Sequence, residues 1–145
     1  MYVRDILSTK GGRIVTIRPD DTIASVTQLL AKHRIGAVLV TNAADGIAGI
    51  LSERDIVRGL AKHGATVADL SVSDLMTRDV HTCTPKDTIS DVMGVMTAQR
   101  IRHLPVLDEE GRLAGIISIG DVVKQRLDET KLEVESLRDY VLAGR

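Results

Sequence analysis

The strongest constraint on the fold of this chain is that it contains nearly the same sequence motif twice. GILSERDIV at residues 49–57 returns as GIISIGDVV at residues 115–123, with a serine and an aspartate three places apart after an apolar stretch. The same offset of 66 residues superimposes PDDT at 19–22 on PKDT at 85–88. Self-similarity at a fixed offset is the signature of a duplicated structural unit. The chain is therefore a tandem duplication, and we expect both copies to fold alike.

The duplication also includes the segment that precedes each copy. VRDIL at residues 3–7 resembles VSDLM at 72–76, now with an offset of 69, so the first copy carries three extra residues near Gly11 and Gly12. The tail from about Gly120 onward has no counterpart at the end of the first copy.

Within one copy the apolar pattern changes period several times. Helical spacing of apolar residues from Ile23 to about Arg34 predicts a helix with a cap near Thr22. Short apolar runs at 37–40 and 47–51, separated by a turn-forming cluster, predict two strands. Helical spacing returns over 53–63 and ends at a glycine. With a strand before the first helix, each copy is strand, helix, strand, strand, helix. We expect an α/β fold in which two copies bury their apolar faces against each other about a pseudo-twofold axis.

Composition excludes several classes of function. The chain has 145 residues, 43% of them hydrophobic, which is enough for a buried core. Its net charge is −1 and only 1% of its residues are aromatic, so neither a basic nucleic-acid surface nor a base-stacking platform is predicted. The N-terminal segment lacks the apolar region of a signal peptide, and we expect a soluble, cytoplasmic protein that contacts neither membrane nor nucleic acid.

The duplicated motifs PDDT and PKDT, and GILSERD and GIISIGD, occur in the same order in both copies. Together with RIRHLPVLD at 100–108, they resemble the tandem cystathionine-β-synthase (CBS) domain pair, or Bateman module. The resemblance divides the chain into repeats at 1–65 and 66–127 and a helical tail at 128–145. It implies a stand-alone module that binds adenosine-containing ligands in clefts between the repeats. It also implies that Asp55 and Asp121, the aspartates at the two strand-to-helix junctions, hold ribose hydroxyls, and that basic or hydroxyl side chains bind the phosphates.

The junction residues admit two interpretations from the sequence itself. Ser52 with Asp55, and Ser118 with Asp121, each match a helix-capping box, which alone could explain them. Both pairs also stand where a helix begins after a strand, so that free amides and the helix dipole favour an anion. A carboxylate there can accept hydrogen bonds from two ribose hydroxyls. Capping and binding are compatible, and we predict a ligand role for all four residues.

Charged residues near the junctions are candidates for phosphate contacts. Arg102 and His103 interrupt an apolar stretch where the first copy has Gly36 and Ala37, so the scaffold itself does not require charge there. The resemblance implies phosphate contacts, and the alternative is a solvated charge at the entrance of a strand. Arg54 stands where the second copy has a glycine and could supply a further phosphate contact. This asymmetry predicts two unequal ligand sites, the first of which includes Gly36.

The remaining candidates are apolar or isolated. Ile35 and Ile101 occupy equivalent positions and are either apolar walls for adenine or core residues. Cys83 is the single cysteine and is interpreted as a buried hydrophobic residue. The four histidines show no metal-ligand spacing. No nucleophile with a base can be assembled, so we predict neither a metal site nor a catalytic residue.

The tail predicts a helix with one apolar stripe. The stripe consists of Val123, Leu127, Val134, Leu137 and Val141. It either lies on its own domain or pairs with a second chain, and the resemblance implies a homodimer. We therefore expect a regulatory module that binds AMP, ATP or NAD(H) and acts on a partner protein. The alternative is a ligand-free interaction module used only for assembly.

Overall fold

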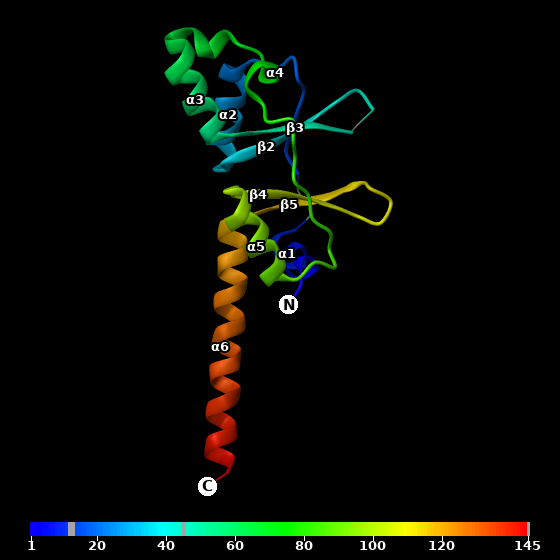
Figure 1. Cartoon of the computed structure of the whole chain (residues 1–145), viewed down its shortest axis with the longest axis vertical. Coiled ribbons are helices and arrows are strands. Elements are labelled where there is room, and N and C mark those ends of the chain that lie inside the picture. Colours follow the sequence, from blue (N-terminus) through cyan, green and yellow to red (C-terminus); the bar gives the residue numbers. More distant parts are fainter. Residues whose placement is uncertain (12–13, 45, 145) are drawn as a thin grey trace. The chain divides into compact units, whose positions relative to one another are not determined.

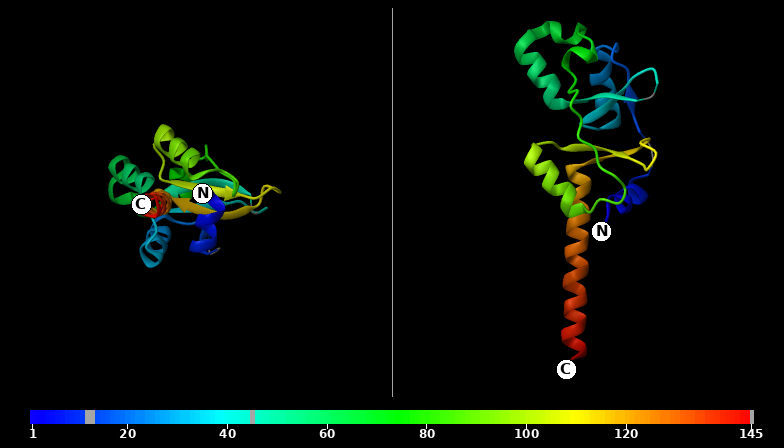
Figure 2. Two further views of the ribbon diagram at one scale, coloured as in Figure 1. Left: turned by 90° about the horizontal axis from the view of Figure 1, so that it is seen from below. Right: turned by 45° about the vertical axis from the view of Figure 1, so that its right-hand side comes forward.

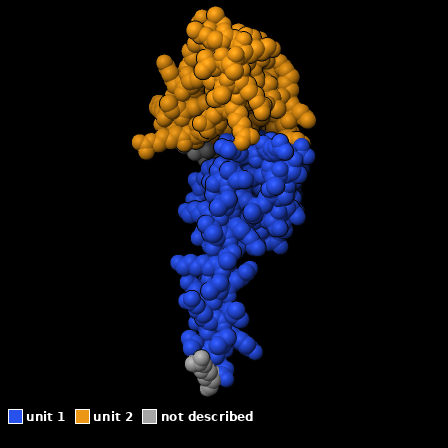
Figure 3. Space-filling model, turned by 60° about the vertical axis from the view of Figure 1, so that its left-hand side comes forward, with its two compact units in different colours: residues 1–13, 82–145 blue, residues 14–81 orange. Residues whose placement is uncertain are grey.

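A computed structural model of the chain describes residues 1–11, 14–44 and 46–144, which Figure 1 traces from the N-terminus to the C-terminus. These residues form two compact units. Unit 1 contains residues 1–13 and 82–145, and unit 2 contains residues 14–81 (Figure 3). The predicted Asn42–Gly46 turn includes Asp45, and the predicted insertion includes Gly12; both of these residues lie outside the described ranges.

Unit 2 holds most of the first copy around a three-stranded sheet. Strand β1 lies parallel to β2, and β2 lies antiparallel to β3. The elements are β1 (Thr16–Ile17), α2 (Ile23–His33), β2 (Ala37–Thr41), β3 (Ile47–Ser52), α3 (Glu53–His63), the 3-10 helix η1 (Gly64–Asp69) and α4 (Val72–Leu75). The predicted order of strand, helix, strand, strand and helix is confirmed here, and η1 and α4 follow it.

Unit 1 holds most of the second copy around a two-stranded antiparallel sheet. Its elements are α1 (Val3–Lys10), α5 (Ile89–Gln99), β4 (His103–Leu107), β5 (Leu113–Ser118) and α6 (Ile119–Ala143). The predicted initial strand is reduced to one parallel bridge between Cys83 and Val106. Cys83 still donates its N–H to the Pro105 carbonyl and accepts from the Leu107 N–H, both at 2.9 Å.

Local sequence explains where the helices begin and end. The hydroxyl of Thr22 accepts the Ser25 N–H at the start of α2, and Thr88 does the same for Asp91 at the start of α5. These side-chain acceptors satisfy amides that have no partner within the helix. α3 ends at His63 and is followed by Gly64, whose φ of 64° suits glycine. The helices predicted in each copy are thus confirmed with their caps.

Each unit is completed by the segment that precedes the other copy in the sequence. Val3, from the start of the chain, is fully buried in the core of unit 1, and its N–H donates to the Asp87 carbonyl at 2.9 Å. Val72, which begins the second copy, is fully buried in the core of unit 2, and its N–H donates to the Asp21 carbonyl at 2.8 Å. The two copies have therefore exchanged equivalent leading helices, so the compact units differ from the repeats along the sequence.

The predicted helical tail is part of one long helix. α6 begins directly after β5 and runs without interruption to Ala143. Leu127, the last residue assigned to the second repeat, lies inside this helix.

Candidate functional site

In unit 2, β3 ends at Ser52 and α3 begins at Glu53. The Ser52 N–H donates to Asp55 Oδ2 at 2.9 Å, and the Asp55 N–H donates to Ser52 Oγ at 3.4 Å. The predicted capping box is therefore present. The other carboxylate oxygen, Asp55 Oδ1, accepts the hydroxyl of Thr77 at 3.2 Å. Asp55 is 9% exposed, so both of its oxygens are bound within a largely buried site.

The second junction has the same cap but a different partner. In unit 1 the Ser118 N–H donates to Asp121 Oδ2 at 2.9 Å, and the Asp121 N–H donates to Ser118 Oγ at 3.2 Å. Lys10, at the end of α1, donates to the same Oδ2 at 2.8 Å and to the Ile116 carbonyl at 3.0 Å. The bonds from Lys10 and from the Ser118 N–H thus share Oδ2. The side chain of Asp121 is 25% exposed, so this carboxylate is more accessible than that of Asp55.

Two opposing effects act on the pKa of Asp121. Partial burial raises the pKa, whereas the hydrogen bond from Lys10, the hydrogen bonds from Ser118 and the charge of Lys10 lower it. The net result is a pKa below the usual value of an aspartate. The carboxylate is therefore ionised at neutral pH and is already paired with an ammonium group.

At each junction the start of one strand lies next to the start of a helix: β2 beside α3 in unit 2, and β4 beside α6 in unit 1. In unit 1, His103 stands opposite Ser118 across the antiparallel pair, and the Ile119 N–H donates to the Arg102 carbonyl at 2.8 Å. Directly opposed residues have Cβ atoms roughly 5 Å apart. The predicted phosphate contacts Arg102 and His103 thus lie beside Ser118, with Arg102 exposed and His103 half-buried.

The first copy repeats this arrangement without the charge. The Glu53 N–H donates to the Gly36 carbonyl at 2.9 Å, and Ala37 stands opposite Ser52. Arg54 is exposed in the first turn of α3. The structure therefore places Gly36, Ser52, Arg54 and Asp55 around one helix start.

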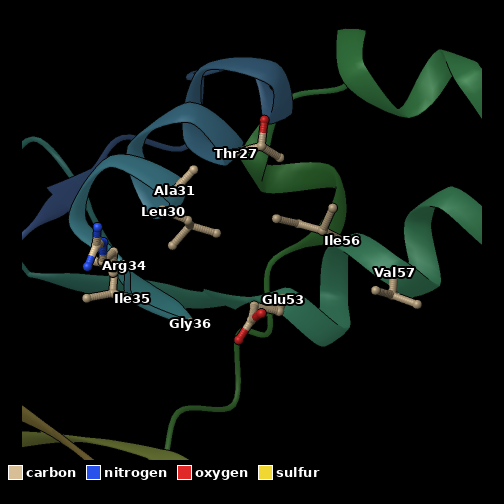
Figure 4. Close-up of a pocket in the computed structure, with 9 residues that line it drawn as sticks. All are labelled: Thr27, Leu30, Ala31, Arg34, Ile35, Gly36, Glu53, Ile56 and Val57. Carbon is tan, nitrogen blue, oxygen red and sulfur yellow. The ribbon is translucent and has the colours of Figure 1, made fainter.

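Unit 2 also contains an apolar groove of about 530 Å³, which Figure 4 shows. Its lining comes from α2, the connection to β2, and the first turns of α3: Thr27, Leu30, Ala31, Arg34, Ile35, Gly36, Glu53, Ile56 and Val57. Of the predicted ligand residues only Ile35 and Gly36 belong to this lining. Ile35 also packs against the core of unit 2, and Ile101 packs against the core of unit 1.

Two partners of the junction aspartates, Lys10 and Thr77, were not predicted from the sequence. Lys10 is the last residue of α1 and Thr77 lies two residues after α4, so both belong to the leading segments that the copies exchange. Thr77 aligns with Ser8 at the offset of 69 residues. The duplicated leading segment was therefore the available signal. It could not show that each segment packs against the other copy.

The structure also bears on other chemistry. In the described parts of the chain, no three histidine, cysteine, aspartate or glutamate side chains gather closely enough to hold a metal ion. None of the helices described has the length and apolarity needed to cross a bilayer. Cys83 is buried as predicted, and burial, followed by the charge of Asp87, raises the pKa of its thiol to about 12.

Comparisons with known proteins agree with the fold. The CBS domain family model matches residues 3–62 and 72–128. The CBS domain-containing protein CBSX3, mitochondrial, of Arabidopsis thaliana is 32% identical over 150 residues, covering 98% of this chain and 72% of that protein. The crystal structure of a CBS-domain containing protein from Agrobacterium tumefaciens is 48% identical, with a TM-score of 0.83, covering 86% of this chain and 92% of the other.

A third comparison concerns a structure with bound ligands. The CBS domain pair of protein MJ0100, solved in complex with 5′-methylthioadenosine and S-adenosyl-L-methionine, is 26% identical with a TM-score of 0.76, covering 90% of this chain and 98% of the other. Two family matches along the chain, and relatives that align over nearly its whole length, show that this chain belongs to the CBS domain family and carries two CBS domains.

Proposed function

We propose that this CBS domain pair is a regulatory module that binds an adenine nucleotide, such as AMP, ATP or NAD(H), and acts on a partner protein. The proposal contains no catalytic step and no metal. It includes a homodimer and a cytoplasmic location, which stay predictions.

The observation that carries the proposal is that the first turn of α3 and the first turn of α6 each contain an aspartate carboxylate. At each junction a serine and an aspartate cap a helix at the end of an apolar strand. The related MJ0100 pair was solved with two adenosine compounds, so the family accommodates an adenosine group. An ionised carboxylate can accept both vicinal hydroxyls of a ribose, and such charge-assisted bonds are stronger than neutral ones.

We propose that the two junctions are unequal as ligand sites. The hydrogen bonds from Lys10 and from the Ser118 N–H both end on Asp121 Oδ2, and in our proposal Oδ1 accepts a ribose hydroxyl. Asp55 uses both oxygens, so a ribose there would have to displace Thr77. Arg102 and His103 add basic side chains beside Ser118, where the first copy has Gly36 and Ala37. These differences favour the Asp121 junction for a phosphorylated ligand.

A thermal melt tests the proposal. A ligand at 100 times its dissociation constant adds about 2.7 kcal/mol to the free energy of unfolding. For a chain of this size that corresponds to a rise of roughly 5–10 °C in melting temperature. Millimolar AMP, ATP, NADH and S-adenosylmethionine should be compared with GMP at equal ionic strength. Unchanged melting with all four adenosine compounds would favour the alternative, a ligand-free interaction module.

A further inference from the structure

The second half of α6 has an unusual environment for a helix. Figures 1 and 2 show α6 continuing well past the other elements of unit 1. All residues from Thr130 to Gly144 are exposed, including Val134, Leu137 and Val141. An isolated helix shorter than about 12–15 residues is marginal in water, because most helical stability comes from packing an apolar face. This segment therefore needs a partner along its apolar side.

The apolar side has the spacing of a coiled-coil seam. From Val123 the positions alternate by four and three residues, which is the a/d pattern of a heptad repeat. The d positions are Val123, Thr130 and Leu137, and the a positions are Leu127, Val134 and Val141. All six are exposed, so the seam continues from the part of α6 that packs in unit 1 into the projecting part. A strict a/d stripe is the narrow surface by which one helix packs on another helix.

We propose that the partner of this seam is α6 of a second copy of the chain, in a parallel two-stranded coiled coil. Among parallel coiled coils, valine at a with leucine at d favours two strands over three or four, and this is the arrangement of Val134, Leu137 and Val141. A second copy also supplies an identical stripe, so each a residue meets its own counterpart.

The flanking charges favour the parallel orientation. In a parallel pair Glu133, at a g position, lies near Arg138 of the other copy, at the following e position, and these charges attract. Arg126 and Lys131 of the other copy would meet in the same geometry and repel each other. This repulsion is reduced because Arg126 is ion-paired with Glu129 of its own helix at 3.0 Å. In an antiparallel pair e positions face e positions, where Lys124, Lys131 and Arg138 would repel one another. The lowest electrostatic cost is therefore that of the parallel pair.

This inference rests on the homodimer in the proposed function but not on nucleotide binding. A loss of the coiled coil and a loss of nucleotide binding can therefore be told apart, because the nucleotide-dependent rise in melting temperature is measured on the same variants.

Leu137 and Leu142 provide a matched pair of substitutions. Both side chains are 63% exposed, but Leu137 lies in the seam and Leu142 lies one position beyond Val141, outside it. In the full chain, Leu137→Glu removes two seam leucines per dimer and brings two carboxylates together. We expect the dimer dissociation constant from sedimentation to rise at least about 100-fold. Leu142→Glu should leave it nearly unchanged. Equal effects of the two variants, or a trimer in the wild type, would overturn the proposal.

Disulfide formation tests the orientation directly. Leu137→Cys should form an intermolecular disulfide under mild oxidation, because equal d positions face each other only in the parallel pair. Asp139→Cys, on the outer side of the helix, is the control and should cross-link far less. The native Cys83 is buried and should not interfere. If Leu137→Cys cross-links no more than Asp139→Cys, the parallel coiled coil is wrong, whether the chain is monomeric, antiparallel or paired through another surface.

Discussion

Lys10 Nζ lies 2.8 Å from Asp121 Oδ2, whereas the equivalent carboxylate in the first copy, Asp55, is bound by the hydroxyl of Thr77. The aspartate of the serine-aspartate cap thus accepts a hydrogen bond from an ammonium group in one copy and from a hydroxyl group in the other. Both partners come from the exchanged leading segments. The duplicated motif therefore provides two chemically different carboxylates within one chain.

The ion pair predicts a pH-dependent contribution to stability. Because the folded state lowers the pKa of Asp121, its contribution is present above the unfolded-state pKa near 4 and is lost as the pH falls through the lower folded value. Both side chains are partly exposed, so Lys10→Met should cost at most about 1 kcal/mol at pH 7. Urea unfolding at pH 7 and at pH 2.5 measures the difference, which should shrink at the lower pH.

Lys86→Met is the matched control for this experiment. Lys86 pairs with Glu109 at 2.6 Å, but both side chains are more than 70% exposed, so its replacement should have a smaller effect. An equal loss of stability from Lys10→Met at both pH values would show that packing, and not the ion pair, accounts for the effect.

Replacement of both Arg102 and His103 by alanine should weaken AMP more than adenosine. Only the phosphorylated ligand loses charge-assisted hydrogen bonds, which contribute about 1.5–3 kcal/mol each. Calorimetric titration of AMP and adenosine measures the two losses. Arg112→Ala, an exposed arginine in the same unit, controls for the change in net charge. Equal losses for AMP and adenosine in the double variant would mean that these residues shape the site without recognising phosphate.

Much of the fold could be predicted because the signals are local. Threonine caps, apolar spacing and a terminal glycine determine helices such as α2 and α3 from residues close in sequence. The capping boxes at Ser52 and Ser118 are likewise local, and both are confirmed. The ligand roles of the junction residues stay predictions, because the geometry of a cap is the same whether or not a ligand binds there.

The long-range relationships could not be predicted in the same way. The leading segments have equivalent sequences, so nothing in VRDIL or VSDLM distinguishes packing on its own copy from packing on the other copy. The partners of Asp55 and Asp121 follow from that choice, which is why Lys10 and Thr77 were missed. The first copy forms the strand β1 through Thr16 and Ile17, whereas the second copy forms only the bridge at Cys83. Sequence patterns do not resolve a difference of one residue pair.

The exchange of leading helices predicts which fragment folds. Residues 14–81 contain the whole core of unit 2, whereas residues 1–65, the first repeat along the sequence, lack Val67, Val72 and Met76. Loss of three buried side chains costs roughly 5–8 kcal/mol, which is comparable to the stability of a small domain. The 14–81 fragment should therefore unfold cooperatively in a thermal melt followed by circular dichroism. Cooperative unfolding of the 1–65 fragment with similar stability would contradict the exchange.

Two glycines should respond in opposite directions to alanine. A Cβ at Gly49 would lie 2.7 Å from the backbone carbonyl oxygen of Thr77, which is held by a hydrogen bond to the Ile50 N–H. Gly49→Ala should therefore destabilise the protein by about 1–3 kcal/mol. A Cβ at Gly94, in α5, meets nothing within 4 Å, so Gly94→Ala should add up to about 1 kcal/mol through helix propensity. Urea unfolding measures both changes, and a stabilising Gly49→Ala would refute the close approach.

Titration of AMP and 2′-deoxy-AMP into the wild type, Asp121→Ala and Asp74→Ala tests whether a junction carboxylate holds a ribose. Asp74 belongs to a third capping box, at the start of α4, and controls for the loss of a cap alone. Removing one hydroxyl leaves an acceptor unpaired, so AMP should bind the wild type about five- to 150-fold more tightly than 2′-deoxy-AMP. This ratio should fall toward one in Asp121→Ala and persist in Asp74→Ala. Equal affinities of the wild type for the two ligands would contradict a ribose at either carboxylate and leave both junctions as helix caps.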